Sequence, residues 1–250
     1  MTYVVGDIHG EYDKANALLS YIPSDEKLIF IGDYINKGPD SKKVIDLLLD
    51  LTEKRSCVFL MGNHEFKLLQ AWRGNPQALD YLAQYGFQAT LESYLEHKIA
   101  ARHFNQLLTL RLFRGIMAQH YRFFKKLQWY YQNANYFVVH AGLPMNKQGR
   151  FKRSPSEKLV FLREEYLRTQ KKYNRKIVIF GHTAFPSVFW DGYKLGIDTG
   201  AVYSRKNGYG RLSAVKLETF ECLNDRGERS RPILVKNREI VLKRGNWREL

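Results

Sequence analysis

Five short polar segments of this chain could carry chemistry, and each directly follows an apolar run. They span residues 6–10, 32–38, 62–65, 140–142 and 181–183. Ligands of open α/β sheets bind beyond the carboxyl ends of the strands, so we expect these segments to meet at one edge. Their side chains include two Asp, four His and Asn63, a set that suits a pair of divalent metal ions. The pattern therefore favours a two-metal site that activates water.

The spacing within the segments indicates how such a site could be built. Asp7 and His9 alternate along a short extended segment, so both side chains can face one ion. Asp33 follows the second apolar run, and one carboxylate can bridge two metals. The second metal could then be completed by three residues that follow later runs: Asn63, His140 and His182. Any one segment could be an ordinary strand-end turn, but five in this order are far more specific.

The elements that must position these residues alternate in type. Apolar runs predict strands near 2–6, 27–31, 57–61, 136–139 and 176–180. Helical periodicity predicts helices over 13–21, from Ser41, from Glu65 and over 156–172. Further short strands are expected at 193–197, 211–217, 233–235 and 239–243. This order favours an α/β fold in which helices cover a sheet.

Residues 66–135 interrupt the alternation with several predicted helices, separated by turns at 74–76, Gly86 and Gly115. We interpret this segment as an inserted helical cap over the strand ends. It is rich in aromatic residues, among them Trp72, Tyr81 and Phe113. We expect these rings to form the core of the cap, and a base-stacking platform is the alternative.

Composition limits the other classes of function. The 250 residues suffice for one large domain, and two cysteines argue against a disulfide framework. We find no signal peptide and no apolar stretch of membrane-spanning length, so we expect a cytoplasmic protein. The net charge is +15, and residues 97–156 contain eleven Lys or Arg but no Asp or Glu. This charge favours anionic substrates, and nucleic acid is a further candidate partner.

The five segments resemble those of the calcineurin-like metallophosphoesterases, in particular the phosphoprotein phosphatase branch. Residues 88–94 (QATLESY) and 196–200 (GIDTG) also resemble bacterial members, and the resemblance covers about residues 1–220. It implies two packed mixed β-sheets flanked by helices, an α/β/β/α sandwich. We expect this domain over 1–224, followed by a basic extension over 225–250 that has no counterpart in the family pattern. The resemblance also implies two divalent ions, most often manganese, with iron, zinc, nickel or magnesium as alternatives.

The resemblance assigns roles to individual residues. The implied metal ligands are Asp7, His9, Asp33, Asn63, His140 and His182. A hydroxide that bridges the ions would attack phosphorus, and His64, oriented by Asn36, would protonate the leaving oxygen. Substrate phosphate would be held by Lys37, Asn63 and Arg163.

One departure from the family pattern concerns the substrate. Phosphoprotein phosphatases usually carry Asp-Arg-Gly where this chain has Asn36-Lys37-Gly38. A neutral residue beside His64 disfavours poor leaving groups such as serine. A Ser/Thr protein phosphatase is nevertheless the main expectation, because most of the chain resembles the bacterial protein phosphatases. The alternatives are a hydrolase of dinucleoside polyphosphates or RNA caps, and a weakly active relative that binds nucleic acid.

Overall fold

The computed structural model describes residues 1–144, 146, 151, 156–170, 172–204 and 207–235, and it contains two packed mixed sheets. The first sheet has the order β11-β10-β9-β1-β2-β3, and the second has the order β12-β7-β8-β6-β5-β4. The strands of the first sheet are β1 (Thr2–Val5), β2 (Lys27–Phe30), β3 (Cys57–Phe59), β9 (Ser213–Lys216), β10 (Cys222–Asn224) and β11 (Arg229–Ser230). Those of the second are β4 (Tyr130–Gln132), β5 (Tyr136–Val139), β6 (Ile177–Phe180), β7 (Phe189–Trp190), β8 (Lys194–Gly196) and β12 (Ile233–Leu234).

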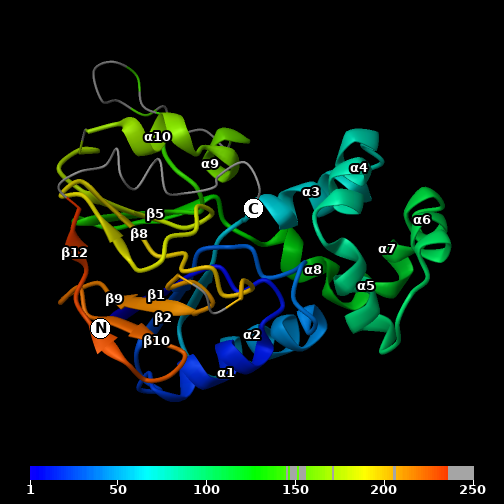
Figure 1. Ribbon diagram of the computed structural model, residues 1–250, viewed down its shortest axis with the longest axis horizontal. Helices are drawn as coiled ribbons and strands as arrows, with labels where there is room; N and C mark the ends of the chain where they lie inside the picture. Colours follow the sequence, from blue (N-terminus) through cyan, green and yellow to red (C-terminus); the bar gives the residue numbers. More distant parts are fainter. Residues whose placement is uncertain (145, 147–150, 152–155, 171, 205–206, 236–250) are drawn as a thin grey trace.

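Helices cover both outer faces, which confirms the expected sandwich (Figure 1). α1 (Tyr12–Ser20) and α2 (Ser41–Lys54) lie against the first sheet, and α9 (Lys158–Phe161) and α10 (Glu164–Arg168) against the second. Strand alternation explains the layers, because Val4 and Ile29 face the second sheet while Val5 and Phe30 face the helices. The strands β1, β2 and β3 are parallel, as are β5, β6 and β8, so their carboxyl ends point the same way within each sheet.

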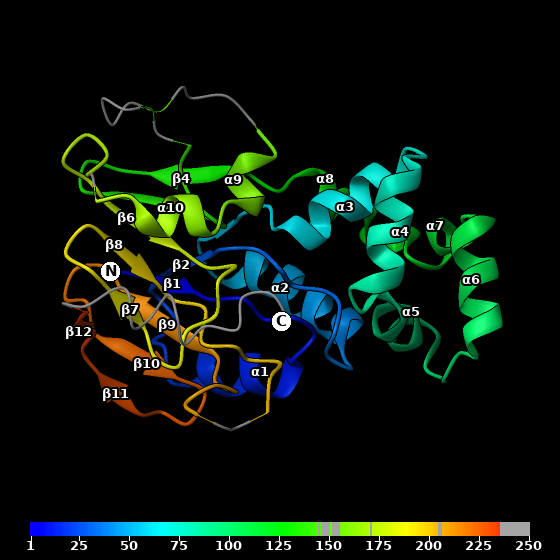
Figure 2. The same ribbon diagram turned by 45° about the horizontal axis from the view of Figure 1, so that its top comes forward.

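The remaining helices form a lobe beside the sandwich (Figures 1 and 2). They are α3 (Asn63–Trp72), α4 (Pro76–Gln84), α5 (Phe87–Leu95), α6 (Ala101–Thr109), α7 (Phe113–Ile116) and α8 (Tyr121–Lys125). Phe87, Phe113 and Phe124 are fully buried, so aromatic rings do form the core of this lobe. Turns at 74–75 and Gly86 separate its first helices as expected, whereas Gly115 lies within α7.

Two regions differ from the sequence-based expectations. The single helix expected over 156–172 is wrong, because Leu162 is extended (ψ 133°) and Arg163 is also non-helical, which separates α9 from α10. Residues 229–230 and 233–234, expected in a C-terminal extension, pair with the two sheets as β11 and β12. The domain limit at 224 stays a prediction, and the expected strand over 239–243 lies outside the described residues.

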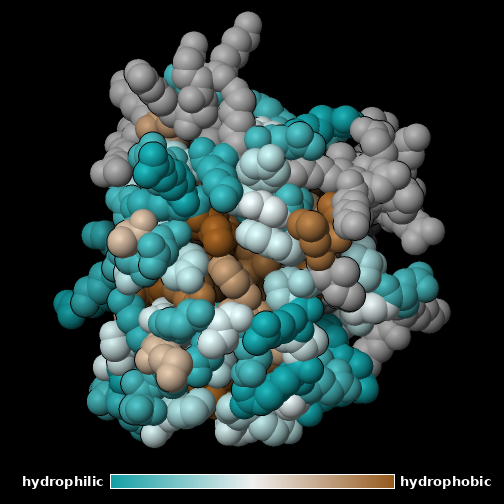
Figure 3. Space-filling view, turned by 90° about the vertical axis from the view of Figure 1, so that its left-hand side faces the viewer, coloured by the Kyte–Doolittle hydropathy of each residue, from teal (hydrophilic) through white to brown (hydrophobic). Residues whose placement is uncertain are grey.

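At the edge of the sandwich that carries β12, apolar side chains reach the surface. Figure 3 shows apolar side chains in the middle of this face, among polar ones. Val188, Trp190 and Phe220, which are partly buried, pack against the core between the sheets. No helix of the described part of the chain is long and apolar enough to cross a membrane, and both cysteines are free.

Candidate metal centre

The structure brings the six expected ligands together beyond the carboxyl ends of the central strands. All six are buried: Asp7, His9, Asp33, Asn63, His140 and His182. Two groups of potential ligands can be distinguished, and within each group the ligand atoms lie within 4.8 Å of one another. The first group is His9, Asp33 and His64, and the second is Asp33, His140 and His182. Asp33 belongs to both groups, which is the arrangement that two neighbouring cations need from a shared carboxylate.

Distances around Asp33 show how closely the imidazoles surround it. Its Oδ2 atom lies 3.5 Å from His9 Nε2 and 3.9 Å from His64 Nε2, while its Oδ1 atom lies 3.4 Å from His140 Nε2. Burial opposes ionisation of this carboxyl, but His140, His64 and His9 hold the pKa of Asp33 well below its usual range. An ionised carboxylate is the form that binds a metal.

Buried polar atoms without hydrogen-bond partners at this centre indicate whether its residues fit a cation. Asp7 Oδ1 and His182 Nε2 are buried, and neither has a hydrogen-bond partner within the described part of the chain. Buried polar atoms are normally paired, and leaving them unpaired is costly. Burial also lowers the pKa of both His9 and His182 well below the usual value, which favours the neutral imidazole that metals bind. These residues therefore fit a pair of cations.

The turns that carry the ligands adopt left-handed backbone conformations. The φ angle is 49° at His9, 53° at Asp33 and 63° at His182. Asn36 and Lys37 follow with 73° and 68°. Such φ values are uncommon for residues other than glycine, and they concentrate at functional sites, where the surrounding structure maintains them. His, Asp and Asn adopt this conformation more readily than most residues, but contacts from the surrounding structure must still hold the turns.

Glu65 supplies those contacts for the Asp33 turn, although sequence reasoning treated it only as the start of a helix. Its carboxylate accepts hydrogen bonds from the backbone N–H groups of Asp33 (2.9 Å), Tyr34 (2.9 Å) and Ile35 (3.2 Å). It also accepts from Gly62 N–H, the N-cap of α3. Burial, together with Asp33, raises the pKa of Glu65 to about 7. A Glu three residues after a helix cap is a capping-box signal, which could have drawn attention to it.

His64 and Asn36, the expected acid and its orienting partner, are in direct contact. Asn36 Nδ2 lies 2.6 Å from His64 Nδ1. Thr90 on α5 fixes the amide, because its Oγ1 accepts from Asn36 N–H and donates to Asn36 Oδ1, each at 2.9 Å. Burial, with Lys37 and His140 adding to the effect, lowers the pKa of His64 to about 4. The role of Thr90 was missed because it depends on a contact between distant segments.

The cleft over this centre has cationic and aromatic walls. Lys37 and Arg163 line it together with four of the candidate ligands, which are His9, Asp33, Asn63 and His182. Lys37 Nζ lies 3.3 Å from His9 Nε2. The break between α9 and α10 places Arg163 in this wall, so the structure brings both expected phosphate-binding residues to the site. Three tyrosines, Tyr81, Tyr85 and Tyr203, complete the walls.

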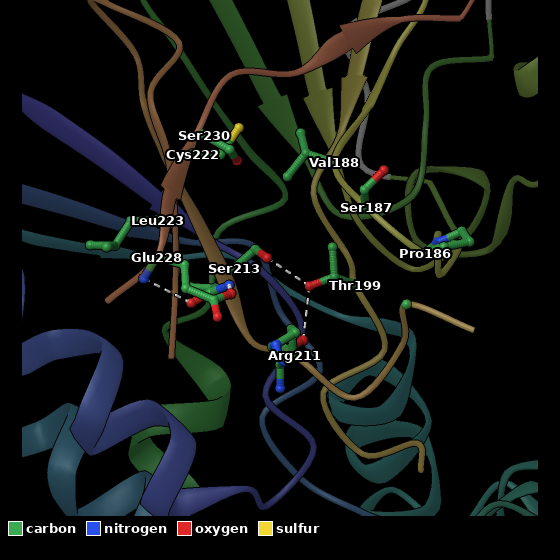
Figure 4. A pocket seen from close by; sticks show the side chains of 12 residues that line it. Pro186, Ser187, Val188, Thr199, Arg211, Ser213, Cys222, Leu223, Glu228 and Ser230 are labelled. Atoms are coloured by element: carbon green, nitrogen blue, oxygen red, sulfur yellow. Dashed lines mark hydrogen bonds between the residues drawn. The ribbon is translucent and has the colours of Figure 1, made fainter. Parts of the chain in front are cut away.

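Asp198 is a further acidic residue of the cleft, to which sequence reasoning gave no role. Burial raises its pKa, and Asp198 in turn contributes, after burial, to the raised pKa of Asp7. The next residue, Thr199, fixes this turn. Its Oγ1 donates to the Arg211 carbonyl oxygen (2.8 Å) and lies 2.7 Å from Ser213 Oγ (Figure 4). Thr199, Arg211 and Ser213 also line a separate pocket of about 210 Å³.

Comparisons with known proteins agree with this geometry. Residues 2–187 match the family model described as calcineurin-like phosphoesterase. The chain is 23% identical to the asymmetrical bis(5′-nucleosyl)-tetraphosphatase PrpE of Oceanobacillus iheyensis, with 81% of this chain and 85% of that protein covered. It is 38% identical over 87 residues to a symmetrical bis(5′-nucleosyl)-tetraphosphatase of Legionella pneumophila, with 31% of each chain covered.

Solved structures share the fold at low sequence identity. A putative diadenosine tetraphosphatase superposes with a TM-score of 0.55 at 22% identity and covers 89% of this chain and 91% of its own. A protein serine/threonine phosphatase from Saccharomyces cerevisiae gives 0.53 at 20% identity, with 86% and 72% covered. The family match spans most of the sequence, and the chain therefore belongs to the calcineurin-like phosphoesterases, which are dinuclear-metal phosphoric ester hydrolases.

Proposed function

We propose that this hydrolase cleaves dinucleoside polyphosphates such as diadenosine tetraphosphate. The observation that carries the proposal is the amide of Asn36 at 2.6 Å from His64 Nδ1. An amide orients the ring but brings no negative charge to stabilise a protonated imidazole. A serine alkoxide needs a proton when it leaves, whereas a nucleoside phosphate leaves readily as an anion. The site is therefore better matched to phosphoanhydrides than to phosphoserine.

The relatives support the same choice. The asymmetrical tetraphosphatases of Oceanobacillus iheyensis and Geobacillus thermodenitrificans align over 81% and 85% of this chain. Likeness to the Saccharomyces cerevisiae protein phosphatase concerns the fold alone. The comparisons thus favour the alternative substrate over the Ser/Thr phosphoprotein that the sequence resemblance placed first.

The proposed mechanism divides the work among residues of the cleft. The metal ions, held by Asp7, His9, Asp33, Asn63, His140 and His182, would supply an activated water and a Lewis acid. Lys37 and Arg163 would bind the phosphate oxygens and stabilise the charge that develops on them. His64, whose Nδ1 accepts from the Asn36 amide, would present an Nε2–H group to the departing oxygen.

The test compares two substrates on the same metal-loaded protein. We expect kcat/KM for diadenosine tetraphosphate to exceed that for a phosphoserine peptide by a hundredfold or more, about 2.7 kcal/mol of transition-state preference. A peptide preference of any size would overturn the proposal. The assay is repeated with manganese, iron, zinc, nickel and magnesium, and we propose manganese as the best activator because the site mixes carboxylate, imidazole and amide ligands.

A further inference from the structure

We propose that Tyr85, stacked on Tyr81, forms a platform that binds a nucleobase of the substrate beside the metal centre. The inference rests on the proposed function, and it names the part of the substrate that this chain recognises apart from phosphate. It concerns the end of α4 in the helical lobe, where both rings line the cleft that holds Asp33 and His64.

The two rings form an incomplete aromatic stack. Their centroids are 4.3 Å apart and their planes are inclined by 26°. Tyr81 is packed on its other sides, edge-on to His64 at 5.8 Å and to Phe161 at 6.0 Å. Tyr85 is 42% exposed, and within the described residues Tyr81 is the one ring against which it stacks. A third flat ring could therefore extend the stack from the cleft side.

Two hydrogen bonds hold this platform at a fixed place relative to the centre. Asn63 Nδ2, from a proposed metal ligand, donates to Tyr81 Oη at 2.6 Å. Lys37 N–H donates to the carbonyl oxygen of Gly86, the residue after Tyr85, at 3.1 Å. Gly86 is left-handed (φ 81°), and a Cβ atom there would lie 2.7 Å from Lys37 N, so the two segments meet closely. The platform is thus bonded directly to Lys37 and to Asn63.

Tyr203, the third tyrosine of the cleft, offers a less suitable ring. Lys37 Nζ lies 5.5 Å from the centroid of the Tyr203 ring, and Tyr209 packs edge-on against that ring at 6.2 Å. Tyr203 therefore supports the cation that faces the phosphates. Of the three tyrosines that line the cleft, Tyr85 is the exposed one, whereas Tyr81 and Tyr203 are partly buried.

The chemistry of stacking defines the ligand class. Every nucleobase has a π-face, so stacking on tyrosine tolerates all bases. We expect the platform to separate nucleotides from base-free phosphates, and not to separate adenine from guanine. This behaviour would suit an enzyme that acts on a group of nucleoside polyphosphates rather than on one of them.

The experiment measures binding by calorimetry, without turnover. AMP and ribose 5-phosphate are titrated into the manganese-loaded full chain, because these two ligands differ only in the base. We expect AMP to bind on the order of tenfold more tightly, in line with the strength of base–aromatic stacking. Tyr85→Ala should remove this difference and leave ribose 5-phosphate binding unchanged, while Tyr85→Phe should retain it. Tyr21→Ala is the matched control, because Tyr21 is 44% exposed but does not line the cleft.

The outcomes separate this inference from the proposed function. Equal affinities for AMP and ribose 5-phosphate in the unsubstituted chain would overturn the platform, even if diadenosine tetraphosphate is hydrolysed. Retention of the AMP preference in Tyr85→Ala would overturn it as well. A preference for phosphopeptide in the turnover assay would instead overturn the proposed function, and the AMP titration would still decide whether Tyr85 binds a base.

Discussion

Asp33 is the residue on which both halves of the proposed centre depend, because its two carboxylate oxygens face imidazoles of both groups. We predict that Asp33→Asn removes most bound metal and lowers kcat/KM by at least about a hundredfold, since an amide cannot bridge two cations as a carboxylate does. Asn tolerates the left-handed φ of 53° at this position, so the fold should persist. Elemental analysis measures the metal, and an unchanged circular dichroism spectrum is the control. Full metal content in this variant would contradict the bridging role.

Asn36 is the residue that should decide how well poor leaving groups are cleaved. We predict that Asn36→Asp raises turnover of an aryl phosphate by on the order of tenfold, because a carboxylate at 2.6 Å from His64 Nδ1 stabilises the protonated ring that donates to the leaving oxygen. Turnover of diadenosine tetraphosphate should change little. The comparison is made at full metal occupancy. An aryl phosphate rate that stays level or falls would refute this role of the pair.

Residue types and order predicted the six candidate ligands, and the family resemblance added Lys37 and Arg163. The structure places all of them in one region, and their roles stay predictions. The signal of the six candidate ligands is local, because each follows an apolar run, whereas Arg163 lies between two short helices. Glu65, Thr90 and Tyr85 were not predicted, since they act by holding a turn, orienting an amide and exposing a ring face. Such roles depend on contacts between segments that are remote in the sequence.

At the scale of elements, Thr90 joins α5 to the segment that carries Asn36. We predict that Thr90→Val lowers kcat for an aryl phosphate with little change in KM, because Asn36 loses the partner of its Oδ1 atom and no longer orients His64. Thr90→Ser should restore the rate. In an Asn36→Ala background the Thr90→Val change should add nothing, as expected for residues that act through one another. An equal loss in both backgrounds would show a merely structural role, and Thr52→Val on α2 is the matched control.

His120 joins α2 to the helical lobe and should make their contact sensitive to pH. Its ring lies between Tyr94 Oη (2.6 Å from Nδ1) and Asp46 (2.9 Å from Nε2), and burial lowers its pKa from 6.5. A depressed pKa means that the unfolded chain takes up the proton first as the pH falls. Stability is therefore complete above about pH 6.5 and declines below it, by at most about 1.4 kcal/mol per pH unit. The melting temperature should fall less between pH 7 and pH 5 in His120→Gln than in the exposed-site control His97→Gln.

The elements themselves were predictable to different degrees. Long apolar runs gave the central strands, because a parallel strand buried on both faces has a continuous apolar signal. The short helices α9 and α10 were merged into one, since Leu159, Val160, Tyr166 and Leu167 are all buried and continue a helical pattern across the break.

At the scale of the whole molecule, the net charge of +15 should accelerate capture of anionic substrates. We predict that kcat/KM for diadenosine tetraphosphate falls by on the order of tenfold between about 10 mM and about 150 mM NaCl, while kcat stays constant. Screening weakens the long-range attraction that steers encounter but not the contacts within the buried centre. Glutamine at Arg122, Lys125 and Lys126, all exposed, should lower the salt slope without changing kcat. A kcat/KM that is independent of salt would contradict steering by this charge, and salt-sensitive retention of labelled RNA would then favour nucleic acid as the partner of the basic surface.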